Sequence, residues 1–243
     1  MSDDCAEVSN GLPPDLSVII PAVDEEENLE LLLPALKQML GELAVRYEIV
    51  VVDGGSADGT VRTANRCGVK VIRQSRRGYG GALLDGFAGT TGRYVVTMDA
   101  DLSHRPVFLK AFWEVRRDAD LVVASRYIPG GVADVAWTRR LLSRILNRTY
   151  RWVLSLSVHD VSSGFRMYRR DVLDGLQVEA RDFDFLEETL IRLHVQGRRI
   201  TEVPFHFMVR GSGRSHIRLV KFGFAFLKTL LRMRRLRTSL QRA

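Results

Sequence analysis

The sequence lacks any long apolar run. Its longest stretches without a charged residue span about eight residues, as in 152–159, whereas a helix needs roughly 18 to 20 apolar residues to cross a bilayer. No membrane-spanning helix is therefore expected. The first residues include Asp3, Asp4 and Glu7, so they are neither basic nor apolar and are not expected to form a signal peptide.

Cysteine is also scarce. The chain has two, Cys5 and Cys67, far apart in the sequence, and we expect both to be free thiols in a cytosolic protein rather than a disulfide. A chain of 243 residues is long enough for one large core. We expect a single domain with terminal helices that face a membrane.

Acidic residues are absent from two segments that are rich in basic ones. Residues 211–243 hold nine Lys or Arg and residues 135–159 hold five, and neither segment has an Asp or Glu. The rest of the chain has 22 basic against 29 acidic residues. The positive charge is therefore concentrated in these two segments. Such a concentration indicates that they bind an anionic partner.

Both segments show the apolar spacing of amphipathic helices, the first near 137–156 and the second near 217–236. Trp or Phe lies on the apolar side, and Arg and Lys lie on another side. Such helices suit an anionic membrane surface, so we expect peripheral attachment to the cytosolic face of a membrane. An ordinary solvated helix surface is the alternative. Nucleic-acid binding is disfavoured because no nucleic-acid module is visible.

Strand and helix patterns alternate along the first half of the chain. Short runs rich in Val and Ile occur at 16–20, 47–52, 69–72, 94–98 and 120–124, separated by segments with helical spacing or helix-start residues. This alternation predicts an α/β fold, a Rossmann-like, mostly parallel sheet with helices on both faces. Ligands in such folds bind at the carboxyl ends of the strands.

Polar clusters occur at three of these strand ends, in residues 21–27, 53–58 and 99–104. In the third, Asp99 and Asp101 directly follow an apolar strand. Two such carboxylates can share a divalent cation, and Mg²⁺ usually combines one or two carboxylates with phosphate oxygens of its substrate. The cluster predicts a site for a metal-bound diphosphate, although Asp is also common in plain turns.

The segments 19–28, 51–60 and 98–106 resemble the three signature segments of inverting, GT-A fold family 2 glycosyltransferases. Later segments match the dolichol-phosphate mannose synthase subgroup of that family, namely Ala124-Ser-Arg-Tyr127, Ser163 to Arg169, Glu202 to Phe207, Arg210 and Gly213-Arg-Ser215. The resemblance covers roughly residues 16–235. We therefore expect residues 1–15 to be a flexible N-terminus, 16–210 the GT-A domain, and 211–243 a basic helix and tail on the membrane surface.

The resemblance implies roles for individual residues around the donor. It implies a nucleotide-sugar site formed by Pro21, Ala22, Glu25, Asp53, Arg77, Gly78, Asp99 and Ala100, with Asp53 reading the base. Asp99 and Asp101 would hold Mg²⁺ or Mn²⁺ on the donor diphosphate. Arg77 and Gly78 belong to a basic, Gly-rich turn at 76–82, where the start of a helix can approach a phosphate. A plain helix start is the alternative interpretation of that turn.

Two departures from the family pattern leave the donor nucleotide open. The usual Thr-Tyr-Asn after Pro21 is Ala22-Val23-Asp24, and the second Asp of the usual Asp-Asp-Gly-Ser is Gly54. The lost aromatic ring removes a surface for stacking on the base. GDP-mannose is the expected donor, and a UDP-sugar is the alternative.

The resemblance also implies a polyprenyl or dolichyl phosphate acceptor. Arg126, Arg139, Ser143 and Arg210 stand at positions that bind the acceptor phosphate, and Arg126 and Arg210 join Asp99 and Asp101 as catalytic residues. Arg suits this task because its planar fork holds phosphate oxygens with two hydrogen bonds. For each Arg, a surface pair with a nearby acid is the alternative.

The expected reaction is the inverting transfer of mannose from GDP-mannose to the lipid phosphate. A membrane-recruited nucleotide-sugar binding module without activity is a remote alternative. The roles of Glu188 and of Ser103 or His104 beside the metal, the lipid chain length, the oligomeric state and the need for a membrane-anchoring subunit stay open at this point.

Overall fold

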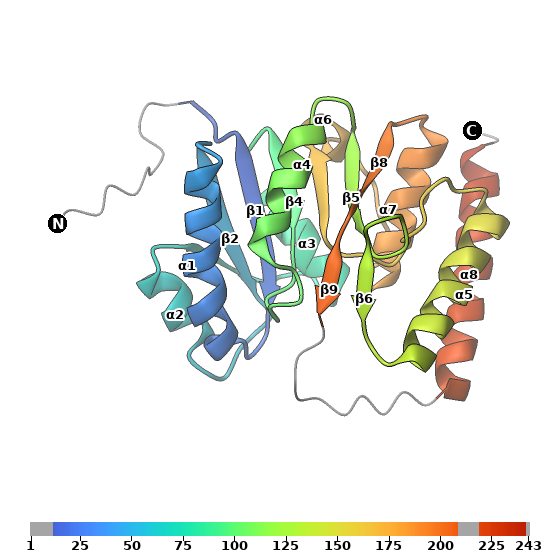
Figure 1. Ribbon diagram of the computed structural model, residues 1–243, viewed down its shortest axis with the longest axis horizontal. Coiled ribbons are helices and arrows are strands. Elements are labelled where there is room, and N and C mark those ends of the chain that lie inside the picture. Colours follow the sequence, from blue (N-terminus) through green and yellow to red (C-terminus); the bar gives the residue numbers. More distant parts are fainter. Residues whose placement is uncertain (1–11, 209–218, 242–243) are drawn as a thin grey trace.

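A seven-stranded sheet forms the centre of the molecule (Figure 1), in the order β3-β2-β1-β4-β7-β5-β8. The computed structural model describes residues 12–208 and 219–241, with residues 219–226 described by their backbone only. The strands of the sheet are β1 (Leu16–Ala22), β2 (Tyr47–Asp53), β3 (Lys70–Arg73), β4 (Tyr94–Thr97), β5 (Leu121–Ser125), β7 (Arg166–Arg169) and β8 (Ile200–Pro204). The predicted N-terminal segment 1–15 lies largely outside the described residues.

Helices cover both faces of this sheet, as the strand and helix alternation predicted. The helices are α1 (Glu26–Glu42), α2 (Thr60–Arg66), α3 (Tyr79–Ala88), the short 3-10 helix η1 (Pro106–Phe108), α4 (Leu109–Val115), α5 (Trp137–Leu154), α6 (Arg170–Leu173), α7 (Asp184–Val195) and α8 (Leu219–Leu240). Helices α1 and α4 pack on one face, and α3 and α7 pack on the other.

Strands β1, β2, β4 and β5 form where they do because each carries buried apolar residues on both faces of the sheet. In β1, Val18 and Ile20 face the core under α1, while Ile19 faces the core under α3, and all three are fully buried. Strands covered on both faces read as continuous apolar runs, which is why the sequence located them well. Strand β3, expected at 69–72, is observed at Lys70–Arg73.

The sheet is parallel except at β7, an antiparallel strand inserted between β4 and β5. This insertion brings the segment before β7 next to the end of β4, where Thr97 Oγ1 donates a hydrogen bond to the carbonyl oxygen of Gly164 at 2.7 Å. A second, two-stranded sheet pairs β6 (Val132–Asp134) with β9 (His206–Met208). Neither feature was predicted, because both depend on pairing between distant segments.

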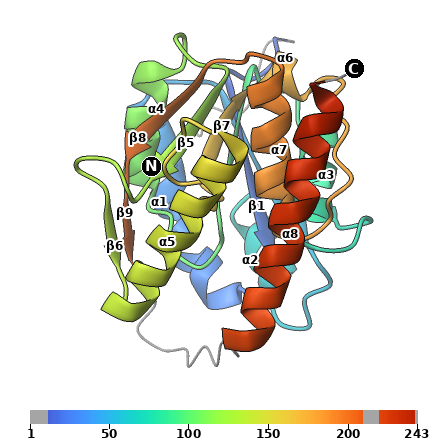
Figure 2. The same ribbon diagram turned by 90° about the vertical axis from the view of Figure 1, so that its right-hand side faces the viewer.

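Helices α5 and α8 lie side by side at one end of the molecule, beside α7 (Figure 2). They occupy the two segments that the sequence predicted as amphipathic helices. In α8, Leu230 and Met233 are buried, while Leu227 and Leu231 are 50% and 46% exposed. No helix of the described residues is long and apolar enough to cross a membrane.

The sequence pattern of this helix places Arg232 in an outward-facing stripe of basic residues, with Arg218, Lys221, Lys228 and Arg235, but its side chain contacts α7 instead. Arg232 pairs with Asp184 and with Glu188, the latter at 3.1 Å. The placement of Arg232 in an outward stripe was therefore wrong. Its guanidinium instead joins α8 to α7, which a sequence pattern cannot reveal because the two acids lie far away along the chain.

Replacing Arg232 by Ala should lower the free energy of unfolding by about 1 kcal/mol. A broken buried pair costs more, but Arg232 is 41% exposed and Glu188 keeps Arg192 as a partner at 2.8 Å, so solvent and the second cation reduce the loss. Urea denaturation followed by circular dichroism measures the change.

Arg235→Ala is the matched control, because Arg235 lies on the exposed side of the same helix without an acidic partner among the described residues. It should change stability by less than about 0.5 kcal/mol. Equal losses in the two variants would show that the Arg232 pairs do not anchor α8.

Candidate functional site

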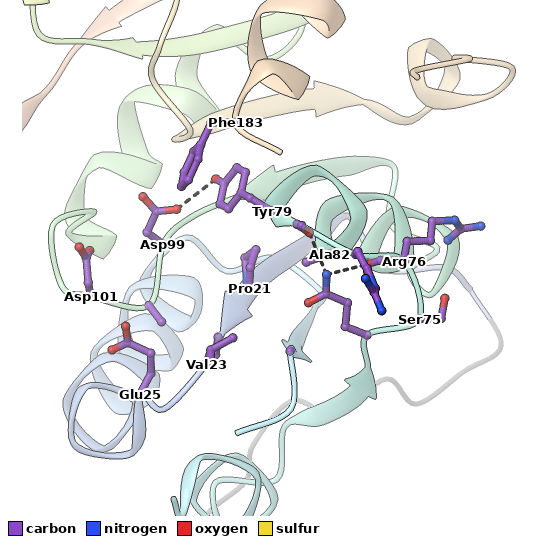
Figure 3. Close-up of a pocket in the computed structure, with 16 residues that line it drawn as sticks. Pro21, Val23, Glu25, Ser75, Arg76, Tyr79, Ala82, Asp99, Asp101 and Phe183 are labelled. Carbon is purple, nitrogen blue, oxygen red and sulfur yellow. Dashed lines mark hydrogen bonds between the residues drawn. The ribbon is translucent and has the colours of Figure 1, made fainter. Parts of the chain in front are cut away.

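A cavity of about 680 Å³ opens at the carboxyl ends of the parallel strands, which is within the usual size of a ligand site. Its lining is Pro21, Ala22, Val23, Glu25, Gly54, Gln74, Ser75, Arg76, Arg77, Gly78, Tyr79, Ala82, Asp99, Ala100, Asp101 and Phe183. The close-up in Figure 3 shows Asp99 between the strand end and the aromatic side chains, with Glu25 and Asp101 on the other side. The structure thus brings together all the predicted donor residues except Asp53.

The loops after β1 and β2 are fastened to each other by carboxylates. Asp24 Oδ1 accepts from the main-chain N–H of Ala57 at 2.7 Å, and the N–H of Glu26 donates to Asp58 Oδ2 at 3.1 Å. Asp53 is buried, and its two oxygens accept from the N–H groups of Gly55 and Ser56. These carboxylates tie the main-chain N–H groups of one loop to the other or to the preceding strand end, so they fix the shape of the cavity wall.

The basic, Gly-rich turn before α3 is held by Asp85. The carboxylate of Asp85 accepts from the main-chain N–H groups of Ser75 and Arg76, at 2.6 and 3.0 Å. Glycine is required at position 78, where φ is +81° and a Cβ atom would lie 2.3 Å from the carbonyl oxygen of Arg181. Arg77 is exposed at the cavity and has no partner among the described residues, so its charge is available to an anion.

The partly buried Tyr79 and the buried His104 hold the carboxylate of Asp99. The Tyr79 hydroxyl donates to Asp99 Oδ1 at 3.1 Å, and burial followed by the charge of Asp99 raises the pKa of Tyr79 well above its usual value, so the phenol keeps its proton. On the other side, His104 Nε2 lies 3.6 Å from Asp99 Oδ2. The exposed ring of Phe183 stacks on Tyr79 with centroids 4.8 Å apart, as Figure 3 shows.

His104 is a structural residue of this site. Its Nδ1 accepts a hydrogen bond from the main-chain N–H of Asp99 at 2.8 Å, which places the ring proton on Nε2, toward the Asp99 carboxylate. The ring is buried and stacks on Phe165 at 4.9 Å between centroids. Burial lowers the pKa of His104, although nearby Asp99 opposes the effect. His104 therefore orients Asp99 as a neutral side chain.

The donor set suits a divalent cation of the Mg²⁺ or Mn²⁺ kind. Asp99 and Asp101 both line the cavity, and only one oxygen of Asp101 accepts a hydrogen bond among the described residues, from the N–H of Ser103 at 3.0 Å. Over the same residues, no group of three or more His, Cys, Asp or Glu gathers as a complete metal cage. Mg²⁺ is usually bound by one or two protein carboxylates together with phosphate oxygens of the substrate. The pair Asp99 and Asp101 fits this kind of site.

The residues expected at the acceptor phosphate lie outside the cavity lining. Arg126 grips the fully buried Asp160 with two hydrogen bonds of 2.7 Å and also reaches Ser162 Oγ at 2.9 Å. The Ser143 hydroxyl accepts from Tyr127 at 2.7 Å. Arg139 is exposed on α5, without a described partner, and Arg210 lies outside the described residues. Arg126 is thus paired with an acid, but the pair is buried and not the surface pair considered as the alternative.

Glu188 is bound up in the protein interior, where it accepts from the N–H groups of Glu179 and Ala180 and pairs with Arg192 and Arg232. These contacts fit a structural role for Glu188 better than the orientation of the sugar, which is the role that the matching acid of the family would imply. Sequence reasoning missed Tyr79, Phe183 and Gln74 as cavity residues. The aromatic pair joins segments about 100 positions apart, so no local pattern could have found it.

Comparisons with known proteins agree with this geometry. A sequence profile described as "Glycosyl transferase family 2" matches residues 17–176. Dolichol-phosphate mannosyltransferase of Pyrococcus furiosus is 35% identical over 227 residues, covering 90% of this chain but 63% of that relative's length. Polyprenol monophosphomannose synthase of Mycolicibacterium smegmatis is 36% identical over 213 residues, covering 82% of this chain and 79% of the relative.

A solved structure shows the same fold. Glucosyl-3-phosphoglycerate synthase from Mycobacterium tuberculosis, crystallised with Mn²⁺, UDP and phosphoglyceric acid, superposes with a TM-score of 0.70 at 24% identity, covering 91% of this chain and 78% of that one. The GT-A fold expected from the sequence is therefore confirmed.

Asp101→Asn should weaken Mn²⁺ binding in the presence of GDP by at least about tenfold, because one of two carboxylate ligands loses its charge. Electron paramagnetic resonance of free Mn²⁺ measures the binding, and circular dichroism checks the fold. Asp118→Asn, an exposed change outside the cavity, should bind Mn²⁺ as the wild type does. Undiminished binding in Asp101→Asn would remove that residue from the metal site.

Proposed function

Because the chain belongs to glycosyl transferase family 2, we propose that it transfers mannose from GDP-mannose to a polyprenyl phosphate, with inversion at the anomeric carbon. The names of the two relatives support the sugar and the lipid class. The cavity with Asp99 and Asp101 at the strand ends carries the proposal, because it can hold a nucleoside diphosphate through a metal. A UDP-sugar donor is the alternative, because Val23 stands where the family has an aromatic residue and so leaves the donor nucleotide open.

The donor end of the site uses fixed carboxylates. The divalent cation, when bound, neutralises the diphosphate and makes it a better leaving group. Asp99 is held by Tyr79 and His104, so it meets the ion without reorganising, and such preorganisation lowers the cost of the reaction. Arg77 adds an unpaired positive charge at the rim of the same cavity.

The acceptor needs orientation more than activation. A phosphate monoester is already an anion at neutral pH, so no carboxylate has to remove a proton before attack. We assign this task to Arg126, although it lies outside the lining of the donor cavity. Burial opposes its charge, but Asp160 and, more weakly, Asp99 raise the pKa of Arg126, so its guanidinium stays charged near the metal carboxylate. Its Nη1 group keeps its hydrogens free of described partners, and Arg139 and Arg210 would add positive charge.

The paired helices α5 and α8 would lie on the membrane that carries the acceptor. Trp137, Leu141, Ile145 and Trp152 follow helical spacing on α5 and are 68%, 49%, 52% and 83% exposed. Contiguous exposed apolar side chains mark an interaction surface. The basic residues around them, Arg139, Arg140, Arg144, Arg148, Lys228, Arg234 and Arg235, have no acidic partner among the described residues. An apolar strip with free cations suits anionic lipid.

A donor panel tests the reaction. With Mg²⁺ or Mn²⁺ and a short polyprenyl phosphate, GDP-mannose should give a mannosyl phospholipid, detected by mass spectrometry, and the product should be the β anomer by NMR. Chelator should abolish the product. Product from UDP-glucose in place of GDP-mannose would support the alternative donor. Donor binding without any product would support a binding module, and full activity in chelator would contradict the metal site.

Membrane attachment is tested by Lys228→Glu with Arg235→Glu on the exposed side of α8. Each lost basic residue weakens binding to an anionic surface by about 1 kcal/mol, so partitioning to anionic vesicles should fall roughly thirtyfold. Lys110→Glu with Arg117→Glu on and after α4 makes the same charge change at exposed positions away from α8 and should bind nearly as the wild type does. Equal losses in the two pairs would mean that only net charge matters.

A further inference from the structure

One part of the cavity wall is formed by Gly54, which follows β2, and Gln74, which follows β3. A Cβ atom at position 54 would lie 2.5 Å from Val23 Cγ2 and 3.0 Å from Gln74 Oε1. A side chain at position 54, where the resembled family carries Asp, would therefore require the side chains of Val23 and Gln74 to move. Gln74 takes up the space, so its amide stands at the cavity wall in place of the missing carboxylate.

The Gln74 amide has one orientation. Its Nε2 donates to the carbonyl oxygens of Arg76 and Gly78, the second at 2.8 Å, and its main-chain N–H donates to the carbonyl oxygen of Asp53 at 2.8 Å. Because two acceptors surround the nitrogen, the oxygen must point the other way. Oε1 is therefore directed to the side where Gly54 lines the cavity.

Gln74 Oε1 has no hydrogen-bond donor among the described residues. An acceptor held in place without a donor is ready for a ligand N–H, since polar atoms that become buried normally find a partner. The carboxylate of Asp53, by contrast, already accepts from Gly55 and Ser56, and Asp53 does not line the cavity. The free acceptor at this wall is the amide of Gln74.

We propose that Gln74 is the residue that reads the base of the donor, through a hydrogen bond from the ring N–H of guanine or uracil to Oε1. Guanine carries this hydrogen on N1 and uracil on N3. Adenine and cytosine present a lone pair at the corresponding ring positions, so two acceptors would face each other. The inference rests on the proposed nucleotide-sugar donor, and it assigns base selection to a residue outside the family's signature segments.

Calorimetric binding of nucleoside diphosphates in Mn²⁺ tests the proposal without any acceptor lipid. Wild-type protein should bind GDP and IDP at least about tenfold more tightly than ADP, or UDP at least about tenfold more tightly than CDP, because an unmatched buried acceptor is costly. The comparisons stay within purines or within pyrimidines, so base size does not contribute. IDP keeps the N1 hydrogen without the 2-amino group of GDP.

Gln74→Met should remove this preference. Binding of the nucleotides that carry the ring N–H should fall about tenfold, while ADP and CDP should change less than about threefold. Gln196→Met, at an exposed position after α7, is the matched control and should keep the wild-type pattern. Gln74→Ser serves the same purpose if Gln74→Met does not fold.

Two results would overturn the inference: a wild type without base preference, or an equal loss for all nucleotides in Gln74→Met. The second would mean that Gln74 only shapes the loop at Arg76 and Gly78. The proposed function fails separately, by the absence of sugar transfer in the donor panel while the base preference and its loss in Gln74→Met persist.

Discussion

Parallel pairing of β1 with β2 and β4 is the constraint on which the site depends. The register places Ala22 beside Asp53 and Ile19 beside Thr97, so the loops that follow the three strands leave the sheet at one edge. Buried Val and Ile on both faces of these strands fix that register, since a shift by one residue would exchange the two faces. The polar residues of the site are thus held together by an apolar core.

Loops that meet at such an edge bring many main-chain N–H groups into partly buried positions. Asp24, Asp53 and Asp85 each accept from two N–H groups, which removes the cost of leaving those donors unpaired. Acids that serve the loops are thereby separated from acids that remain open to a ligand. Asp99 and Asp101 keep oxygens open to a ligand, because neither pairs with a described Lys or Arg and Asp101 accepts from a single loop N–H, that of Ser103.

The features of the site that depend on a local sequence pattern could be predicted from the sequence. The strand ends, the carboxylates after β4 and the basic turn before α3 were predicted because apolar runs and Gly-rich turns are local signals. The antiparallel β7, the clamp of Tyr79 and His104 on Asp99, and the pairs of Arg232 depend on contacts between distant segments. Gln74 was missed for a different reason: nothing in its neighbourhood distinguishes it, and only the crowding around Gly54 shows its place.

A chain of side-chain contacts joins helix α8 to the donor cavity. Arg232 of α8 pairs with Asp184, the first residue of α7, and the preceding Phe183 stacks on Tyr79, which donates to Asp99. The helix with the free basic surface therefore rests on the element that carries the aromatic wall of the donor cavity. Outside the two basic segments acids outnumber bases, 29 to 22, so the charge that favours anionic lipid is kept apart from the carboxylates that favour a cation. Under the proposed function, such a separation would let one small domain bind a metal-diphosphate donor and an anionic surface at once, because neither site would have to neutralise the other.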